Sequence, residues 1–196
     1  MLISIVGKSG SGKTTIAKLL ESFDKRIIHI DVDKIAHYVL TIPEVKERIK
    51  KDISYTCIID EEIQRKVLGK IVFSSPQYMD KLAEITWPYM EKIIDSKIQA
   101  NEGKIIILDY LLLPKTKYFL QSDLRIWVNS PIEERFERIV KRGVNEQTIS
   151  KEYFLKRDEA GINYEEGLYD IVINNSNKKS TFQEVRKVYE KSIISR

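Results

Sequence analysis

The stretch GKSGSGKT at residues 7–14 matches the phosphate-binding pattern G-x-x-x-x-G-K-[ST] in full. Residues 2–6 predict a buried strand before it, and residues 13–23 predict an amphipathic helix after it. In this setting the glycines let the backbone turn, so that its N–H groups surround an anion at a positive helix end. A glycine-rich turn with a chance lysine would not need these flanking elements. We therefore expect phosphate binding at Gly7, Gly10, Ser11, Gly12, Lys13, Thr14 and Thr15.

The lysine and the first threonine of the loop have separate expected tasks. Lys13 should reach the β- and γ-phosphates of ATP, and the Thr14 hydroxyl should bind Mg²⁺. Markers of two other nucleotide-dependent classes are missing. The run nearest to the GTPase pattern N-K-x-D is NKKS at residues 177–180, and the L-S-G-G-Q pattern of ABC-type ATPases does not occur. What remains is a kinase that phosphorylates a small molecule.

Four further apolar runs alternate with helical patterns along the chain. Continuous apolar runs of this length are typical of strands buried on both faces of a parallel sheet. Their alternation with helices indicates an α/β fold. We therefore predict a doubly wound parallel sheet of the P-loop NTPase type, flanked by helices. The four runs lie at residues 27–30, 105–109, 124–128 and 171–173.

Two stretches interrupt this alternation and predict the domain organisation. Residues 34–100 have helical patterns apart from one weak strand-like run at 55–59, so we expect an inserted helical subdomain. Residues 130–167 are highly charged and begin with SPIE, a helix start with a serine cap, proline in the first turn and glutamate three residues after the cap. We expect a helical lid there. The predicted nucleotide-binding core consists of residues 1–33, 101–129 and 168–196.

Composition narrows the function classes. The chain has 196 residues, 42% of them apolar, as expected for one globular domain. Its single cysteine, Cys57, excludes an intrachain disulfide, and its two histidines argue against a structural metal site. The 33 basic and 29 acidic residues are interspersed, which argues against a nucleic-acid partner. We find no run long enough for a signal peptide or a membrane span, so we expect a cytoplasmic protein with no membrane partner.

Aspartates come where two of the predicted strands end. Ligands of open α/β sheets bind outside the carboxyl ends of the strands. There Asp33, two residues after Asp31, could accept the proton of an attacking hydroxyl or help to hold Mg²⁺. Equally, it could cap the helix that begins at Lys34. Asp109 could contact Mg²⁺ through water, like a Walker B acid, or could be a solvated strand-end carboxylate.

Three arginines of the predicted lid share one helical face, because Arg135, Arg138 and Arg142 are spaced i, i+3 and i+7. Over a bound nucleotide, such a lid neutralises charge and excludes water. The alternative is a solvated face whose arginines pair with nearby glutamates. With a phosphate loop in the same chain, we expect at least one of these arginines to act in the lid, and Arg157 is a further candidate.

Six segments together resemble the dephospho-CoA kinase family over nearly the whole chain. The segment DVDKIA at residues 31–36 is similar to the family pattern D-x-D-x-[IV]-A. The other five follow in the family's order and spacing. They are IQRKVLGKIVF at 63–73, ITWP at 85–88, DYLLL at 109–113, ERFER at 134–138 followed by KRG at 141–143, and DIVINNS at 170–176.

The resemblance implies transfer of the terminal phosphate of ATP to the ribose 3′-hydroxyl of dephospho-CoA, the last step of CoA synthesis. It implies a CoA-binding role for the helical subdomain at residues 34–100. It assigns the base to Asp33, an acceptor contact to Arg65 and a lid arginine near the phosphates to Arg142. Arg138 of the same helix is a second candidate for the nucleotide. Asn175 and its neighbours would lie near the adenine of ATP.

The chain departs from the family pattern at several positions. Gln64 stands where the family usually has aspartate, Trp87 where it has histidine, and Leu111 where it has proline. Lys115 falls where an acid is common, and Arg157 falls near a lid glutamine. As a candidate acceptor contact, Trp87 could stack on an adenine or could fill the junction between domains.

Most of these changes lie where the acceptor should bind, so two alternatives stay open. One is a P-loop kinase for another nucleoside or nucleotide, and the other is a non-catalytic ATP-binding regulator. The presence of Lys13, Thr14 and Asp33 argues against the second.

Overall fold

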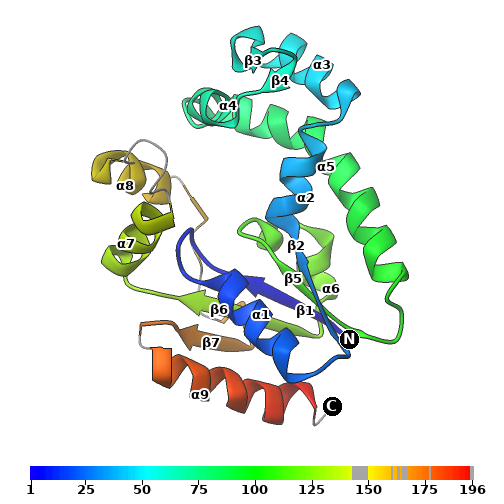
Figure 1. Cartoon of the computed structure of the whole chain (residues 1–196), viewed down its shortest axis with the longest axis vertical. Helices are drawn as coiled ribbons and strands as arrows, with labels where there is room; N and C mark the ends of the chain where they lie inside the picture. Colours follow the sequence, from blue (N-terminus) through cyan, green and yellow to red (C-terminus); the bar gives the residue numbers. More distant parts are fainter. Residues whose placement is uncertain (143–149, 160, 163, 165–166, 177, 195–196) are drawn as a thin grey trace. The chain divides into compact units, whose positions relative to one another are not determined.

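The computed structural model describes residues 1–142, 150–159, 161–162, 164, 167–176 and 178–194 (Figure 1). The chain forms two compact units. The first comprises Met1–Asp31 and Asn101–Arg196, and the second comprises Val32–Ala100. The predicted Lys13–Phe23 helix has the predicted bounds, as does the strand Ile105–Asp109. Three other predicted strands each extend one residue further than predicted. They are Ile27–Asp31, Leu124–Asn129 and Ile171–Asn174.

The first unit contains a five-stranded parallel sheet in the order β2-β5-β1-β6-β7, which confirms the predicted α/β class. The strand of the phosphate loop, β1, is therefore central, and its carboxyl end meets those of its two neighbours. The elements of this unit are β1 Leu2–Val6, α1 Lys13–Phe23, β2 Ile27–Asp31, β5 Ile105–Asp109, a 3₁₀ turn at Leu113–Lys115, α6 Lys117–Gln121, β6 Leu124–Asn129, α7 Ile132–Arg142, α8 Lys151–Glu159, β7 Ile171–Asn174, α9 Lys178–Val188 and a π-helical turn at Tyr189–Ile193.

Helices cover both faces of this sheet (Figure 1). Alternate residues of β1, Ile3 and Ile5, belong to an apolar core that includes Ile16 and Leu20 of α1. The residue between them, Ser4, points to the other face, where its hydroxyl shares a 2.6 Å hydrogen bond with the hydroxyl at the end of α6. This core fixes α1 against the sheet, and with it the loop that leads into α1.

The second unit is helical around the long helix α5, which packs against α2, α3 and α4. The weak strand-like run at residues 55–59 forms a strand only at its end, Ile58–Ile59. Its first half is a 3₁₀ turn, and the rest pairs only with Glu62–Ile63, across a two-residue turn whose residues have positive φ. The elements are α2 Val32–Val39, α3 Pro43–Asp52, η1 Tyr55–Cys57, β3 Ile58–Ile59, β4 Glu62–Ile63, α4 Arg65–Val72 and α5 Pro76–Gln99.

The structure contradicts the alternative in which Asp33 caps a helix, and it contradicts the predicted cap at Ser130. Because α2 begins at Val32, directly after β2, Asp33 lies inside its first turn instead of capping a helix that begins at Lys34. Because α7 begins at Ile132, Ser130 lies before the cap position, and its hydroxyl donates to the carbonyl of Asn175 at 2.9 Å.

Among the helices of the described residues, none is long and apolar enough to span a membrane.

Candidate functional site

The phosphate loop has the backbone shape that its glycines allow. Gly10 and Gly12 have φ of 80° and 97°, a region that residues with a Cβ rarely adopt. A Cβ on Gly10 would lie 2.5 Å from the carbonyl oxygen of Arg135, and one on Gly12 would collide with the side-chain amide of Asn175. The glycines therefore serve two purposes, since they permit the turn and they let α7 and the end of β7 approach the loop.

The outer surface of the loop is held by side chains from these elements. Arg138 donates from Nη1 to the carbonyl oxygens of Gly10 and Ser11, both at 3.3 Å. Asn175 donates from Nδ2 to the same Ser11 oxygen at 2.7 Å. In a trans peptide the carbonyl and the following N–H point in opposite directions. Fixing these carbonyls toward α7 therefore directs the N–H of Gly12 to the opposite side, where an anion can be bound.

The groups that accept hydrogen bonds from Arg138 also link α7 to the end of β7. The Arg138 Nη2 atom donates to Glu134 at 2.6 Å and to the Asn175 carbonyl at 2.7 Å. Its Nη1 atom donates to the Ser130 hydroxyl at 2.9 Å. The arginine is thus fixed by five acceptors, which leaves its plane little freedom.

A partly buried ion-pair cluster joins the loop to α7 and α8. We call Lys8, Arg135 and Asp158 the Asp158 cluster. Arg135 donates from its two terminal nitrogens to the two carboxylate oxygens of Asp158, at 2.5 and 2.8 Å. Lys8 approaches the same carboxylate at 3.1 Å, and Arg135 also donates to the carbonyl of Ser9 at 3.3 Å. Burial acts to raise the pKa of Asp158, but the hydrogen bonds from Arg135 and Lys8 outweigh it and lower that pKa.

The predicted metal ligands lie together beneath the loop. Ile5 of β1 is in register with Asp109 of β5, so the carboxylate comes next to the start of α1. Thr14 donates from Oγ1 to Oδ2 of Asp109 at 2.6 Å. Asp109 is 1% exposed, and its Oδ1 atom has no hydrogen-bond partner among the described residues. Lys13 is also buried, at 8% exposure.

This pair fits Mg²⁺, which prefers oxygen ligands and is usually bound by one or two protein groups together with substrate phosphates. Within the described residues, no group of three or more His, Cys, Asp or Glu side chains could hold a metal ion by itself. The hydroxyl of Thr14 and the carboxylate of Asp109 are oxygen donors of the right kind. Any ion here would therefore share its coordination with a bound nucleotide.

A cavity of about 340 Å³ lies beside the loop. Tyr164 and Trp127 stack along one wall, with ring centroids 5.8 Å apart. The Tyr164 hydroxyl donates to the carbonyl of Leu111 at 3.0 Å, and burial raises the pKa of this tyrosine well above its usual value. The lining residues are Lys8, Ser11, Trp127, Val128, Asn129, Ser130, Arg135 and Tyr164.

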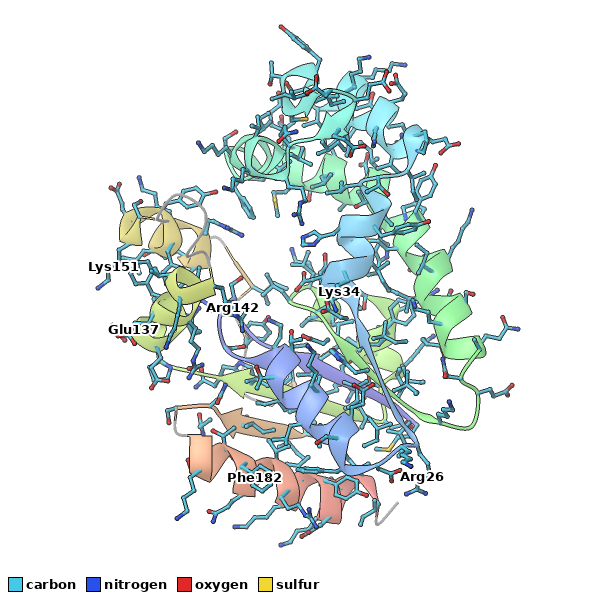
Figure 2. The ribbon with its side chains drawn as sticks, in the orientation of Figure 1. Arg26, Lys34, Glu137, Arg142, Lys151 and Phe182 are labelled. Atoms are coloured by element: carbon cyan, nitrogen blue, oxygen red, sulfur yellow. The ribbon has the colours of Figure 1, made fainter. Side chains whose placement is uncertain are left out.

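The remaining predicted residues are placed as follows. Arg142 is exposed at the end of α7, where Figure 2 labels it. Asp33 and Arg65 are exposed in the first turns of α2 and α4 of the second unit. Trp87 is half-buried in α5, and its Nε1 atom donates to Glu91 at 3.0 Å. The contacts of Arg157 include the ring of Tyr153, 5.7 Å from the guanidinium carbon.

Sequence reasoning missed Lys8 and Asp158. They are 150 residues apart, so no local spacing relates them. The only signal was a lysine at a variable position of the loop pattern. The spacing of the three arginines correctly placed Arg135 and Arg138 on one helical face. It could not predict that Arg135 pairs with Asp158 or that Arg138 donates to the loop carbonyls.

Comparison with known proteins gives a consistent answer. The family model described as dephospho-CoA kinase matches residues 1–181. A curated dephospho-CoA kinase of Aquifex aeolicus is 32% identical over 194 residues, which covers 96% of this chain and 95% of the relative.

Two solved structures are similar over nearly the full length. A Thermus thermophilus protein, TT1252, has a TM-score of 0.80 at 25% identity, covering 98% of this chain and 97% of that one. The dephospho-CoA kinase from Campylobacter jejuni has a TM-score of 0.67 at 25% identity, covering 97% of this chain and 96% of that one.

Proposed function

Because the chain belongs to the dephospho-CoA kinase family, which catalyses the last step of CoA biosynthesis, we propose that its own acceptor is dephospho-CoA. The match of the family model over residues 1–181 carries this proposal. It includes the helical second unit as well as the nucleotide half, so the similarity is not confined to the phosphate loop. The enzymes of the family use ATP with Mg²⁺.

The proposed nucleotide site uses the residues of the first unit. The loop N–H groups and Lys13 bind the β- and γ-phosphates, and Thr14 and Asp109 hold the ion. When bound, Mg²⁺ neutralises charge on the phosphate oxygens. Arg138 and Asn175 keep the loop in its binding shape, a role supported by their bonds to the loop carbonyls.

The proposed acceptor residues are exposed residues of the second unit. Asp33 accepts the proton of the 3′-hydroxyl, and Arg65 binds the acceptor. We assign Trp87 to the acceptor side as well. Arg142, exposed at the end of α7, stabilises the charge on the transferring phosphate.

The proposed reaction conserves atoms and charge. The 3′-oxygen of the acceptor forms a bond to the γ-phosphorus, and the bond from that phosphorus to the β,γ-bridging oxygen breaks. ADP leaves, and the hydroxyl proton passes to Asp33. We also propose the cytoplasm as the compartment of this ATP-consuming reaction.

The test is ADP production, measured by a coupled assay with ATP and Mg²⁺. Dephospho-CoA is compared with a panel of nucleosides and nucleotides, since departures such as Gln64, Leu111 and Lys115 fall in segments expected near the acceptor. Turnover specific to dephospho-CoA is the expected result. Turnover only with another acceptor would overturn the proposed substrate, and ATP binding without turnover across the panel would overturn the enzyme assignment.

A further inference from the structure

A buried histidine lies next to the proposed metal ligand. His29 is in the middle of β2, which pairs with β5 so that His29 is in register with Ile107 and Asp31 with Asp109. The side chains of His29 and Asp109 are 5% and 1% exposed. The Nε2 atom of His29 is 3.5 Å from Oδ2 of Asp109. The imidazole therefore borders the carboxylate that accepts the Thr14 hydrogen bond.

Both side chains have polar atoms that the described part of the chain leaves unsatisfied. Neither Nε2 of His29 nor Oδ1 of Asp109 has a hydrogen-bond partner there. An unpaired buried polar atom costs about 1–3 kcal/mol, so such atoms are uncommon in native proteins. An N–H···O hydrogen bond is about 2.9 Å long. A shift of a few tenths of an ångström would therefore convert the 3.5 Å approach into a hydrogen bond.

Packing alone does not explain a histidine at this position. Ile27, which points to the same face of β2 as His29, belongs to an aliphatic core. An aliphatic side chain would fill this place without burying ring nitrogens. Thr14 makes a single bond to Oδ2 of Asp109, and Nε2 of His29 approaches the same oxygen from β2, so the two groups together restrict the rotation of the carboxylate.

We propose that His29 is a positioning residue, which holds the Asp109 carboxylate in the orientation that accepts the Thr14 hydroxyl and binds the ion of the ATP complex. The imidazole does not contact the nucleotide; it acts through Asp109. This inference rests on the proposed function only in the assignment of Thr14 and Asp109 as the groups that hold Mg²⁺. Groups that orient metal ligands in this way affect metal affinity by about 10–100-fold.

The test measures binding of ADP and ATP by calorimetry as a function of Mg²⁺ concentration, and again in EDTA, with the full chain and no acceptor. His29→Leu should raise the half-saturating Mg²⁺ concentration about tenfold and leave nucleotide affinity in EDTA unchanged. His29→Gln should restore most of the Mg²⁺ dependence, because its amide nitrogen reaches about as far as Nε2. His37→Leu changes the other histidine of the chain and should have no effect.

A double mutant separates positioning from packing. With Asp109→Asn in place, His29→Leu should cause no further change in Mg²⁺ dependence. An equal change in both backgrounds would overturn the inference, as would wild-type Mg²⁺ dependence in His29→Leu or a failure of His29→Gln to restore it. If His29→Leu does not fold, His29→Asn replaces it in the same double-mutant comparison, because its shorter side chain does not reach Oδ2 of Asp109. These measurements need no acceptor, so their failure is distinct from a failure of dephospho-CoA turnover.

Discussion

The nucleotide residues and the acceptor residues differ in how the chain supports them. In the first unit Lys13, Asp109 and Arg135 are each less than 10% exposed. Thr14 is hydrogen-bonded to Asp109 of β5, and the loop is held by Arg138 of α7 and by Asn175, which follows β7. In the second unit the proposed acceptor residues Asp33 and Arg65 are exposed.

This difference separates the structural basis of nucleotide binding from that of acceptor binding. A site whose donors are fixed before binding needs little reorganisation when the phosphates arrive. The nucleotide function can therefore be inferred from this chain's own contacts. The acceptor function rests on the family match, and variants in the two units should differ in which substrate they affect.

The largest effect is expected at the proposed base. Asp33→Asn should lower kcat by roughly 10²–10⁴, the usual contribution of general base catalysis, because the amide cannot accept the hydroxyl proton. The ATP dissociation constant should stay within about twofold of wild type, since the residue does not serve the phosphates. Turnover is measured by the coupled ADP assay and ATP affinity by calorimetry.

The control is Asp80→Asn, an exposed aspartate of α5 in the same unit, which should retain wild-type turnover. If Asp33→Asn kept its full kcat, the second unit would not supply the base. A loss of ATP binding in the same variant would show that Asp33 also serves the nucleotide, against the division between nucleotide and acceptor residues.

The next effect belongs to the loop lysine. Lys13→Ala should lower kcat/KM by about 10²–10³ and weaken ATP binding as well, because a buried cation is lost from the phosphate site. Lys18→Ala, at an exposed position of α1, serves as the control for charge. Unchanged binding and rate in Lys13→Ala would contradict the phosphate-loop assignment.

The third prediction concerns the stability of the first unit. Asp158→Asn leaves Arg135 buried with an uncompensated charge and should destabilise folding by about 3 kcal/mol at neutral pH. Chemical denaturation measures this free energy of unfolding. The exposed neighbour Glu159→Gln should change it by less than about 0.5 kcal/mol. A loss of similar size in both variants would mean that the Asp158 cluster contributes nothing specific.

The same carboxylate predicts a pH dependence. The pKa of Asp158 is lower in the folded chain than its ordinary value of about 4, so its contribution is complete above that value and is lost as pH falls through the folded pKa. The free energy of unfolding of the wild type should therefore decline more steeply than that of Asp158→Asn below about pH 4. Parallel pH curves would contradict this assignment.

Sequence patterns were sufficient for the features that depend on short spacing. The loop pattern, the apolar strands and the face shared by Arg135 and Arg138 all follow from local periodicity, and each has the expected secondary structure. The apolar runs gave the strands but not their order, since pairing depends on packing of the whole sheet.

The contacts that complete the site could not be predicted in this way. Lys8 with Asp158, Ser130 with Asn175 and His29 with Asp109 join residues that are 45 to 150 positions apart. They depend on the order of the parallel strands and on the contact of α8 with the loop, neither of which local spacing determines. The mistaken cap at Ser130 has the same origin, since a local capping signal was overridden by a bond to a distant carbonyl.

The smallest predicted effect tests that bond. Ser130→Ala removes the hydroxyl that donates to Asn175 and accepts from Arg138, so it should destabilise folding by about 1 kcal/mol and raise the KM for ATP only a few-fold. Ser176→Ala, at an exposed position next to Asn175, is the matched control and should be neutral. An increase in the KM for dephospho-CoA with no change in that for ATP would place Ser130 on the acceptor side. Because Ser130 lies in the first unit, this outcome would break the division between nucleotide and acceptor residues more directly than any of the larger effects.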